Sequence, residues 1–240
     1  MLKKVKQNSL QTIISNVILS VVVLIIALVS FFPQKSASIL INASSDVIYK
    51  GNTEKEQVSL MFNVYWGSEN IPSILDTLKS EDVKCTFFIG GSWADNNGEL
   101  LKRMVEEGHE IANHGYFHKS HDKLSLESNK QEILNAEKVI SSLVNVKTIL
   151  FAPPSGAYSK NTTKACSELG YKVIMWSKDT IDWRDKNEEL CFTRATKNVS
   201  SGDLILMHPM EHTAKALPGV LKFYKEKGLR VVTVTQNIQD

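Results

Sequence analysis

Short apolar runs alternate with longer amphipathic segments along the chain downstream of residue 56. The short runs predict strands at 58–63, 84–89, 110–112, 148–151, 172–175, 203–207 and 230–233. The longer segments predict helices at 71–80, 97–107, 128–144, 159–169, 187–198 and 213–227. Strands that alternate with helices predict βαβ units and a parallel sheet, hence an α/β fold. Seven strands in one domain favour a closed or nearly closed barrel over an open five-stranded sheet.

The N-terminal region differs in character from the rest of the chain. Residues 1–12 form a basic tail that contains Lys3, Lys4 and Lys6 and no acidic residue, and residues 13–32 carry no charge. A helix of about 20 apolar residues spans a bilayer, and a basic flank stays on the cytoplasmic side. We therefore expect a single-pass transmembrane anchor at 13–32 in the cell membrane, with the tail 1–12 in the cytoplasm and residues 39–240 outside it.

A cleaved signal peptide is the alternative for residues 13–32, and the protein would then be secreted. The apolar run exceeds the usual signal length of about 7–15 residues, so the anchor is favoured. The triplet that resembles a cleavage site is Ser36-Ala37-Ser38. Residues 33–56 are polar and predict a linker, with a short strand at 38–42. The globular domain is then expected to cover 57–240, which is an ordinary size for one domain.

Composition narrows the class of protein. The chain has 240 residues with 42% hydrophobic and 22% charged residues, which excludes global disorder. A formal charge of +2 argues against a nucleic-acid binder, because neutralising phosphates requires a concentrated basic face. Cys85, Cys166 and Cys191 are too few for a disulfide framework and lack the paired spacing of a zinc site.

Candidate chemistry follows the predicted strands. Parallel β/α folds place functional groups where strands end, and three of the six histidines, His114, His118 and His208, lie there. His114 and His118 are four residues apart, which suits a first-row divalent metal, although a solvated loop is the alternative. His208 closes an apolar strand, and by itself it fits equally a hydrogen-bonded core histidine. The positions of Asp179 and Asp182 fit three alternatives: helix caps, turn residues or carboxylates that orient a histidine.

Taken together and in order, these segments resemble the polysaccharide deacetylases of the NodB-homology type, a family of carbohydrate esterases. The resemblance covers about residues 57–235. The stretch from Thr86 to His118 resembles the family's pattern between its first two motifs. The family's third, fourth and fifth motifs are resembled by APPSGAY (152–158), WSKDTIDW (176–183) and LILMHP (204–209). The Trp66-Gly67 pair resembles the sporulation-associated subgroup.

The resemblance implies a distorted (β/α)7-type barrel and metal-dependent removal of N-acetyl groups from cell-wall glycan. In the family an Asp and two His hold a divalent metal, which polarises the amide and the attacking water. A second Asp acts as the base, a His protonates the leaving amine, and an Arg steadies the base. Carried onto this chain, the metal ligands are His114 and His118, and the acid is His208, oriented by Asp182 or, as second choice, Asp179. Four residues are expected to contact the glycan: Trp66, Pro153, Pro154 and Trp183.

Three positions depart from the family's pattern. The base position is Asn63, which cannot accept a proton near neutral pH, and the position of the metal-binding Asp is Val64, which cannot coordinate an ion. The position of the Arg is Ala152. These changes are consistent with one another. An Arg beside a neutral Asn63 would be a buried, unpaired cation at a cost of several kcal/mol, and Ala152 avoids that cost.

Two hypotheses follow for the function. The first is a hydrolase that acts on N-acetylated cell-wall polysaccharide or peptidoglycan, with activity weakened by the altered site. The second is a catalytically inactive relative that binds glycan or acts as a scaffold at the cell envelope. In both, the divalent metal, zinc or similar, is expected to be weakly held or absent, and no nucleic acid is expected as partner.

Overall fold

The computed structural model describes residues 16–17, 19–21, 23 and 47–239. The chain divides into two units, 1–43 and 44–240, and the described residues of the first unit are helical. No helix among the described residues is long and apolar enough to cross a membrane. The predicted tail at 1–12, most of the predicted anchor at 13–32 and the predicted strand at 38–42 lie outside the described residues.

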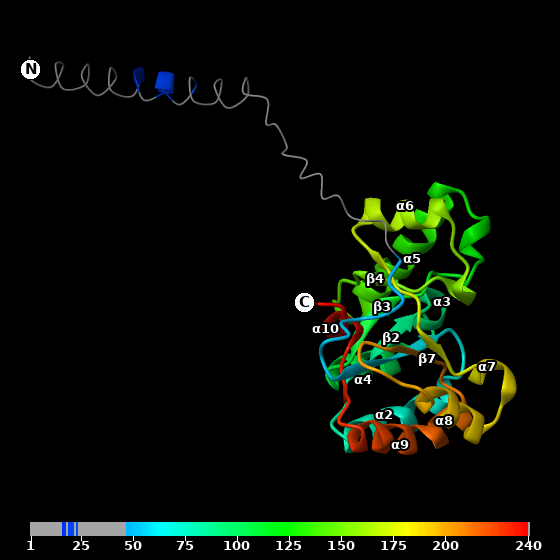
Figure 1. The fold of residues 1–240 in the computed structure, drawn as a ribbon. Helices are drawn as coiled ribbons and strands as arrows, with labels where there is room; N and C mark the ends of the chain where they lie inside the picture. Colours follow the sequence, from blue (N-terminus) through cyan, green and yellow to red (C-terminus); the bar gives the residue numbers. More distant parts are fainter. Residues whose placement is uncertain (1–15, 18, 22, 24–46, 240) are drawn as a thin grey trace, which may run out of the picture. The chain divides into compact units, whose positions relative to one another are not determined.

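The second unit is built on a curled parallel sheet (Figure 1). Its strands are β1 (Gln57–Val64), β2 (Thr86–Ile89), β3 (Glu110–Asn113), β4 (Leu150–Phe151), β5 (Lys172–Val173), β6 (Lys178–Asp179), β7 (Leu204–Met207) and β8 (Arg230–Val231). They lie in the order β5-β4-β3-β2-β1-β7-β6, and β8 pairs with β1. All seven predicted strands are present, and the two-residue β6 was missed. The α/β class and the barrel-like curl are confirmed.

Residues 47–56, which the sequence placed in the linker, pack against this sheet. Ile48 forms a parallel bridge with Ile174, next to β5, and Lys50 forms an antiparallel bridge with Asp203, next to β7. The Gly51 amide also donates to the Gly202 carbonyl at 2.7 Å. This segment therefore connects the β5 side of the sheet with the β7 side. Among the described residues, no strand pairing connects β5 with β6.

The helices are α2 (Ile71–Ser80), α3 (Gly91–Ala94), α4 (Gly98–Glu106), α5 (Leu126–Val144), α6 (Lys160–Leu169), α7 (Asp182–Asp185), α8 (Glu188–Thr196), α9 (Glu211–Glu226) and α10 (Val234–Ile238). The six predicted helices correspond to α2, α4, α5, α6, α8 and α9. The short α3, α7 and α10 were not predicted, because one turn is too short to show a helical period. Helices α2, α8 and α9 lie together at one side of the sheet, and α5 and α6 lie at another (Figure 1).

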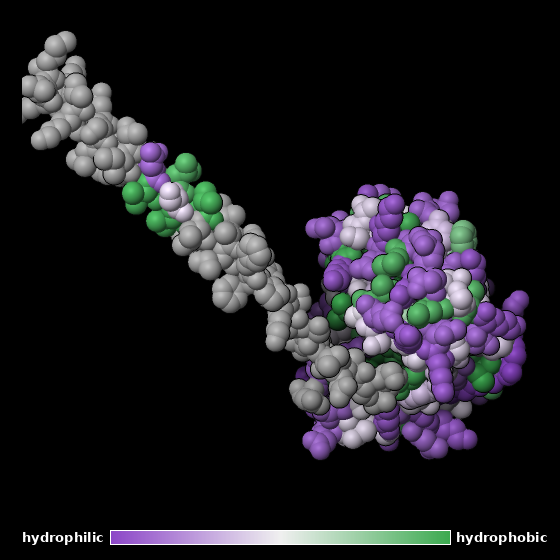
Figure 2. Space-filling model, turned by 90° about the horizontal axis from the view of Figure 1, so that it is seen from above, coloured by the Kyte–Doolittle hydropathy of each residue, from purple (hydrophilic) through white to green (hydrophobic). Residues whose placement is uncertain are grey.

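Strand β1 is buried along its whole length, and its two faces contact different clusters. Val58, Leu60, Phe62 and Val64 belong to the large apolar cluster that the outer helices cover. Met61 belongs to a smaller cluster that also contains Ala152 and Ile174. Successive side chains of a strand point to opposite faces, so Asn63 lies on the same face as Met61. The outer surface of the unit is mostly hydrophilic, with scattered apolar residues, on the face that Figure 2 shows.

The loop after β1 touches the loop after β7. Gly67 has a left-handed backbone (φ +79°), and a Cβ there would lie 2.3 Å from the carbonyl oxygen of Pro209. The Asn70 side chain donates to the same carbonyl at 3.0 Å. This contact sets the position of Trp66 relative to His208, the neighbours of Gly67 and Pro209 in sequence.

Gly67→Ala should therefore destabilise the domain more than a glycine substitution that meets no neighbour. Gly170 is the matched control, since it has a similar φ of +77° and no atom within 4 Å of its Cβ position. Gly170→Ala should lower the free energy of unfolding by roughly 1–2 kcal/mol, the cost of a left-handed alanine. Gly67→Ala should cost a further 1–3 kcal/mol or so, the usual penalty for overpacking. Urea unfolding of both variants measures the difference, and equal losses would contradict the close contact.

Candidate functional site

A cavity of about 260 Å³ opens where strands β1, β3, β6 and β7 end. Its lining residues are Asn63, Trp66, His114, His118, Ser155, Trp176, Asp179, Trp183, Leu206 and His208. The structure thus brings together the three predicted histidines, the base position and both predicted tryptophans. Trp66 and Trp183 are 44% and 49% exposed, so each presents a large part of its ring to a ligand.

Pro153 and Pro154, which the sequence placed at the glycan, do not line this cavity. Both are buried, and the residue of their loop that reaches the cavity is the exposed Ser155. A proline fixes its own φ, so here the two rings shape the loop rather than the binding surface. Sequence reasoning also gave no role to Ser155 or Leu206.

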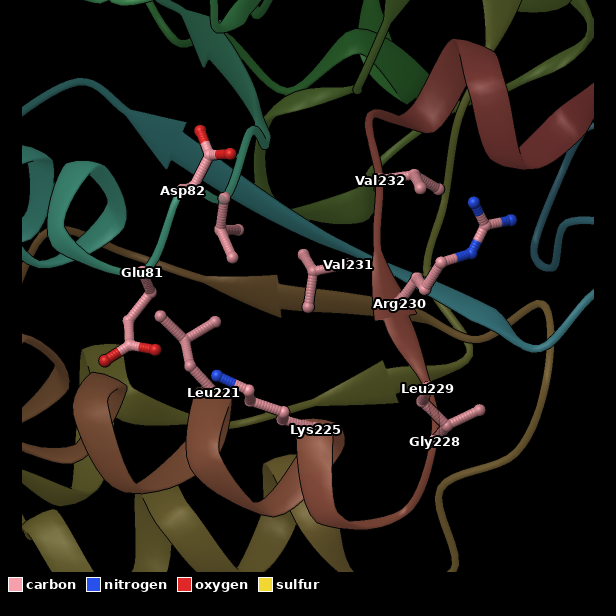
Figure 3. Close-up of a pocket in the computed structure, with 10 residues that line it drawn as sticks. Glu81, Asp82, Leu221, Lys225, Gly228, Leu229, Arg230, Val231 and Val232 are labelled. Atoms are coloured by element: carbon pink, nitrogen blue, oxygen red, sulfur yellow. The ribbon is translucent and has the colours of Figure 1, made fainter.

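A larger hollow of about 440 Å³ lies between the end of α2, the end of α9 and β8 (Figure 3). Its lining includes Glu81, Lys225 and Arg230 together with several aliphatic side chains. Asp82 and Val83 precede β2, and Gly228 and Leu229 precede β8, so this hollow lies at the amino ends of strands. Functional groups of parallel β/α folds gather at the carboxyl ends, which favours the smaller cavity as the site.

His208 is held by Asp182 behind the cavity. Nδ1 of His208 donates to Oδ1 of Asp182 at 2.8 Å, and the His208 amide donates to Oδ2 at 2.7 Å. Thr213 donates to the same Oδ2 at 2.7 Å. With Nδ1 committed to the carboxylate, Nε2 is the ring atom left for a ligand. Asp182 is therefore the carboxylate that orients His208, as the first choice from the sequence had it.

These bonds decide the charge of Asp182. Burial alone would raise the pKa of its carboxyl, but the hydrogen bonds and charge of His208, with the bond from Thr213, hold the pKa below its ordinary value. Asp179, the second choice, lines the cavity instead, and its Oδ1 accepts the Ile181 amide at 2.8 Å. Burial raises the pKa of Asp179.

His114 and His118 lie side by side, with ring centroids 5.2 Å apart. His114 is buried and its Nδ1 bonds the Ala152 carbonyl at 2.8 Å, which leaves Nε2 as the free ring atom. Burial lowers the pKa of His114 well below its ordinary value, and burial also lowers the pKa of His118. Both rings are therefore neutral near pH 7 and can act as acceptors.

The loop that carries His118 is fixed by a buried carboxylate of α5. Glu132 accepts the Phe117 amide at 2.8 Å and the Tyr116 amide at 3.2 Å, and it pairs with Lys119 at 2.8 Å. His118 itself has a left-handed backbone (φ +53°). Such a conformation persists only where the surroundings impose it. Sequence reasoning missed Glu132, because a glutamate within an amphipathic helix normally faces solvent.

The three substituted positions lie in different surroundings. Asn63 is 5% exposed, and its Oδ1 is buried without a hydrogen-bond partner among the described residues. Val64 belongs to the outer apolar cluster, and Ala152 to the inner one. An arginine at position 152 would thus enter an apolar cluster, as the sequence argument about an unpaired cation requires.

The residues present do not fit a tightly held divalent metal. No group of three or more His, Cys, Asp or Glu side chains among the described residues is arranged to hold one. His114 and His118 are neutral donors, the amide of Asn63 is also neutral, and Val64 supplies nothing. Such a set lacks the negative charge and the third strong ligand that metal sites of this kind use.

We predict that any divalent ion contacts His114 and His118 and is removed easily. After dialysis of the full-length protein against EDTA, elemental analysis should find far less than one zinc, cobalt or nickel ion per chain. Zinc added back should bind weakly, and His118→Asn should weaken it further. An ion that stays bound stoichiometrically through EDTA would reveal a third ligand absent from this account.

Comparison with known proteins agrees with the geometry. The family model "Polysaccharide deacetylase" matches residues 50–174, and the chain belongs to this family. A peptidoglycan-N-acetylglucosamine deacetylase of Bacillus cereus is 30% identical over 80% of this chain and 71% of its own length. The uncharacterised protein YlxY of Bacillus subtilis is 37% identical over 79% of this chain. The chain spans 59% of the length of YlxY.

Solved structures add a comparison that bears on the altered site. BA3943 of Bacillus anthracis, described as a CE4 family pseudoenzyme, is 34% identical with a TM-score of 0.79. The match covers 81% of this chain and 69% of that one. A mutant of BA3943, 32% identical with a TM-score of 0.79, is described as having restored enzymatic activity. That match covers 81% of this chain and 72% of the mutant.

Proposed function

We propose that the domain binds N-acetylated cell-wall glycan, such as peptidoglycan, in the cavity that contains His208, and that it does not hydrolyse this glycan. The observation that carries the proposal is Asn63, a neutral amide in the cavity at the position of the family's base. An amide cannot take a proton from water near neutral pH. The relatives named as peptidoglycan deacetylases, and BA3943 as a pseudoenzyme, support the same choice.

The remaining groups suit binding. Trp66 and Trp183 offer exposed aromatic faces at the cavity, and such rings pack well on the apolar faces of sugars. The imidazoles of His114, His118 and His208 offer hydrogen-bonding groups for hydroxyl and amide groups of a sugar. The cavity therefore keeps contacts for a glycan while lacking a base.

Residual hydrolysis is the second candidate function, and the intact pair of His208 and Asp182 favours it. A histidine that acts as a general acid needs a fixed ring orientation, and the buried carboxylate of Asp182 fixes the ring of His208. General acid–base catalysis contributes typically 10²–10⁴-fold in rate, so an acid without a base retains part of it at most.

Acetate release from N-acetylated chito-oligosaccharides and from peptidoglycan, with and without zinc or cobalt, decides between the two. The wild type should bind these glycans and release little acetate. The double variant Asn63→Asp, Ala152→Arg should release acetate faster by about 10²-fold or more with added zinc or cobalt, because it restores a base and the Arg that pairs with it. His208→Ala in the double-variant background should remove this gain.

The single variants serve as controls. Ala152→Arg alone should lower the melting temperature, since it buries a cation without a partner. Asn63→Asp alone should gain less turnover, because no Arg steadies the new carboxylate. Val64→Asp alone should lower the melting temperature and leave metal affinity unchanged, because residue 64 lies in the outer apolar cluster, on the face of β1 away from His114 and His118. A wild type that matches the double variant in turnover would establish the hydrolase and refute the first proposal.

We further propose that the domain faces the outside of the cell membrane, tethered by residues 13–32. The charge-free run and the basic tail before it support this. Protease added to intact protoplasts should digest the domain in cells that express the full chain. Complete protection, with digestion only after lysis, would reverse the orientation.

A further inference from the structure

The short helix α7 carries two residues of the site on a strained stretch of backbone. Asp182, which orients His208, is its first residue, and the cavity-lining Trp183 is its second. The residues on either side of the helix, Ile181 and Lys186, both have left-handed backbones, with φ of +52° and +41°. Such a conformation is unfavourable for residues other than glycine, and for a β-branched residue such as isoleucine it is rare. The segment therefore keeps its shape only because its surroundings impose it.

Arg194 of helix α8, which lies beside α7 (Figure 1), bonds both ends of this segment. Its Nη1 donates to the Thr180 carbonyl at 2.9 Å, just before the left-handed Ile181, and its Nη2 donates to the carboxylate of Asp185, the last residue of α7. Thr180 is itself fixed to β7, since its hydroxyl donates to the Leu206 carbonyl at 2.8 Å. A guanidinium is planar and rigid, so one side chain that bonds both ends fixes the distance between them.

Arg194 is the less exposed of two arginines that pair with Asp185. Its side chain is 26% exposed, against 56% for Arg184. Hydrogen bonds from Arg184 and Arg194 hold the pKa of the Asp185 carboxyl well below its ordinary value, so the carboxylate stays charged at neutral pH. Because Arg184 belongs to α7 itself, Arg194 is the one of the two that fixes this helix to a neighbouring element.

We propose that Arg194 is a positioning residue of the site, which keeps α7 in its strained form. Without Arg194, the backbone of Ile181 relaxes towards the conformations that isoleucine prefers, and the two residues that follow it turn away from the cavity. The carboxylate of Asp182 then loses its alignment with His208, and the indole of Trp183 leaves the lining. The placement of α7 by Arg194 does not depend on the proposed function, and only its effect on glycan binding rests on it.

Helix α9 offers the competing explanation, because it also bonds this segment. Thr213 donates to the Asp182 carboxylate, and His212 bonds the Asp182 carbonyl, each at 2.7 Å. These bonds hold one residue in the middle of the segment, and they leave the backbone on either side of it free to relax. If they are sufficient, removal of Arg194 changes nothing at the cavity.

Proton NMR of the free, full-length protein tests the positioning role without any glycan. The Nδ1–H proton of His208 reports its bond to Asp182, and the indole N–H proton of Trp183 reports the surroundings of that ring. Arg194→Ala should shift or broaden both signals. Arg184→Ala is the matched control, because it removes an ion pair within α7 and none to another helix, and it should leave both signals unchanged.

A second substitution separates positioning from general stabilisation. Asparagine adopts the left-handed backbone more readily than isoleucine, so Ile181→Asn should restore both signals in the Arg194→Ala background. A loss of stability caused only by a missing ion pair would not be recovered at position 181. Arg194→Lys keeps the positive charge without the planar fork, so it should show a smaller change of the same kind, and it takes the place of Arg194→Ala if that variant fails to fold.

Calorimetric titration with N-acetylated chitotetraose measures the same effect in binding. Arg194→Ala should bind this sugar about threefold to tenfold more weakly than the wild type, the effect of one lost aromatic contact. Ile181→Asn should recover most of this loss in the Arg194→Ala background, and Arg184→Ala should bind as the wild type does.

The outcomes separate this inference from the proposed function. A wild type that binds no sugar refutes the proposed function and leaves the NMR test of Arg194 intact. Signals of His208 and Trp183 that stay unchanged in Arg194→Ala would refute the positioning role. Equal changes in Arg184→Ala, or a failure of Ile181→Asn to restore the signals, would refute it as well.

Discussion

The alternation of side chains along β1 is the constraint on which the rest of the site depends. This strand is buried from end to end and pairs with β2, β7 and β8. A shift of its register, or a rotation that exchanged its two faces, would break its pairing with these strands. The alternation gives Asn63 to the cavity and Val64 to the outer apolar cluster. The central strand of the domain thereby offers the cavity a neutral amide where a carboxylate would be needed for proton transfer.

The charges of the cavity follow from this arrangement. One wall keeps a buried anion, Asp182, which is stabilised by His208 and Thr213 and cannot move away from them. Elsewhere in the lining, burial lowers the pKa of His114 and His118, Asn63 is a neutral amide, and Asp179 adds a carboxyl group whose pKa burial raises. The lining therefore offers mostly uncharged hydrogen-bonding groups to a sugar. Glu132 holds the backbone of the loop that carries His118.

Much of this site could be predicted from the sequence, because parallel strands bring their carboxyl ends to one edge. His114, His208, Asn63 and Trp66 were placed together on that basis, and the pairing of His208 with Asp182 followed from the resemblance. Contacts between distant segments could not be predicted in this way. Glu132 and Thr213 act through hydrogen bonds made by helix residues with no distinctive spacing, and residues 48–51 join the sheet edges over too few residues to show a period. Buried Pro153 and Pro154 show that matching a motif locates a loop but does not say which of its side chains reach the ligand.

Proton NMR of the full-length protein with an N-acetylated peptidoglycan oligosaccharide tests the central claim most directly, because one sample reports binding and hydrolysis together. Saturation transferred from the protein should appear on the acetyl methyl protons and on the protons of the same sugar ring. No free acetate signal should grow over hours, even with zinc present. Acetate that accumulates at the rate of an active peptidoglycan deacetylase, or an absence of saturation transfer to the sugar, would contradict the account of a glycan-binding site that has lost its base.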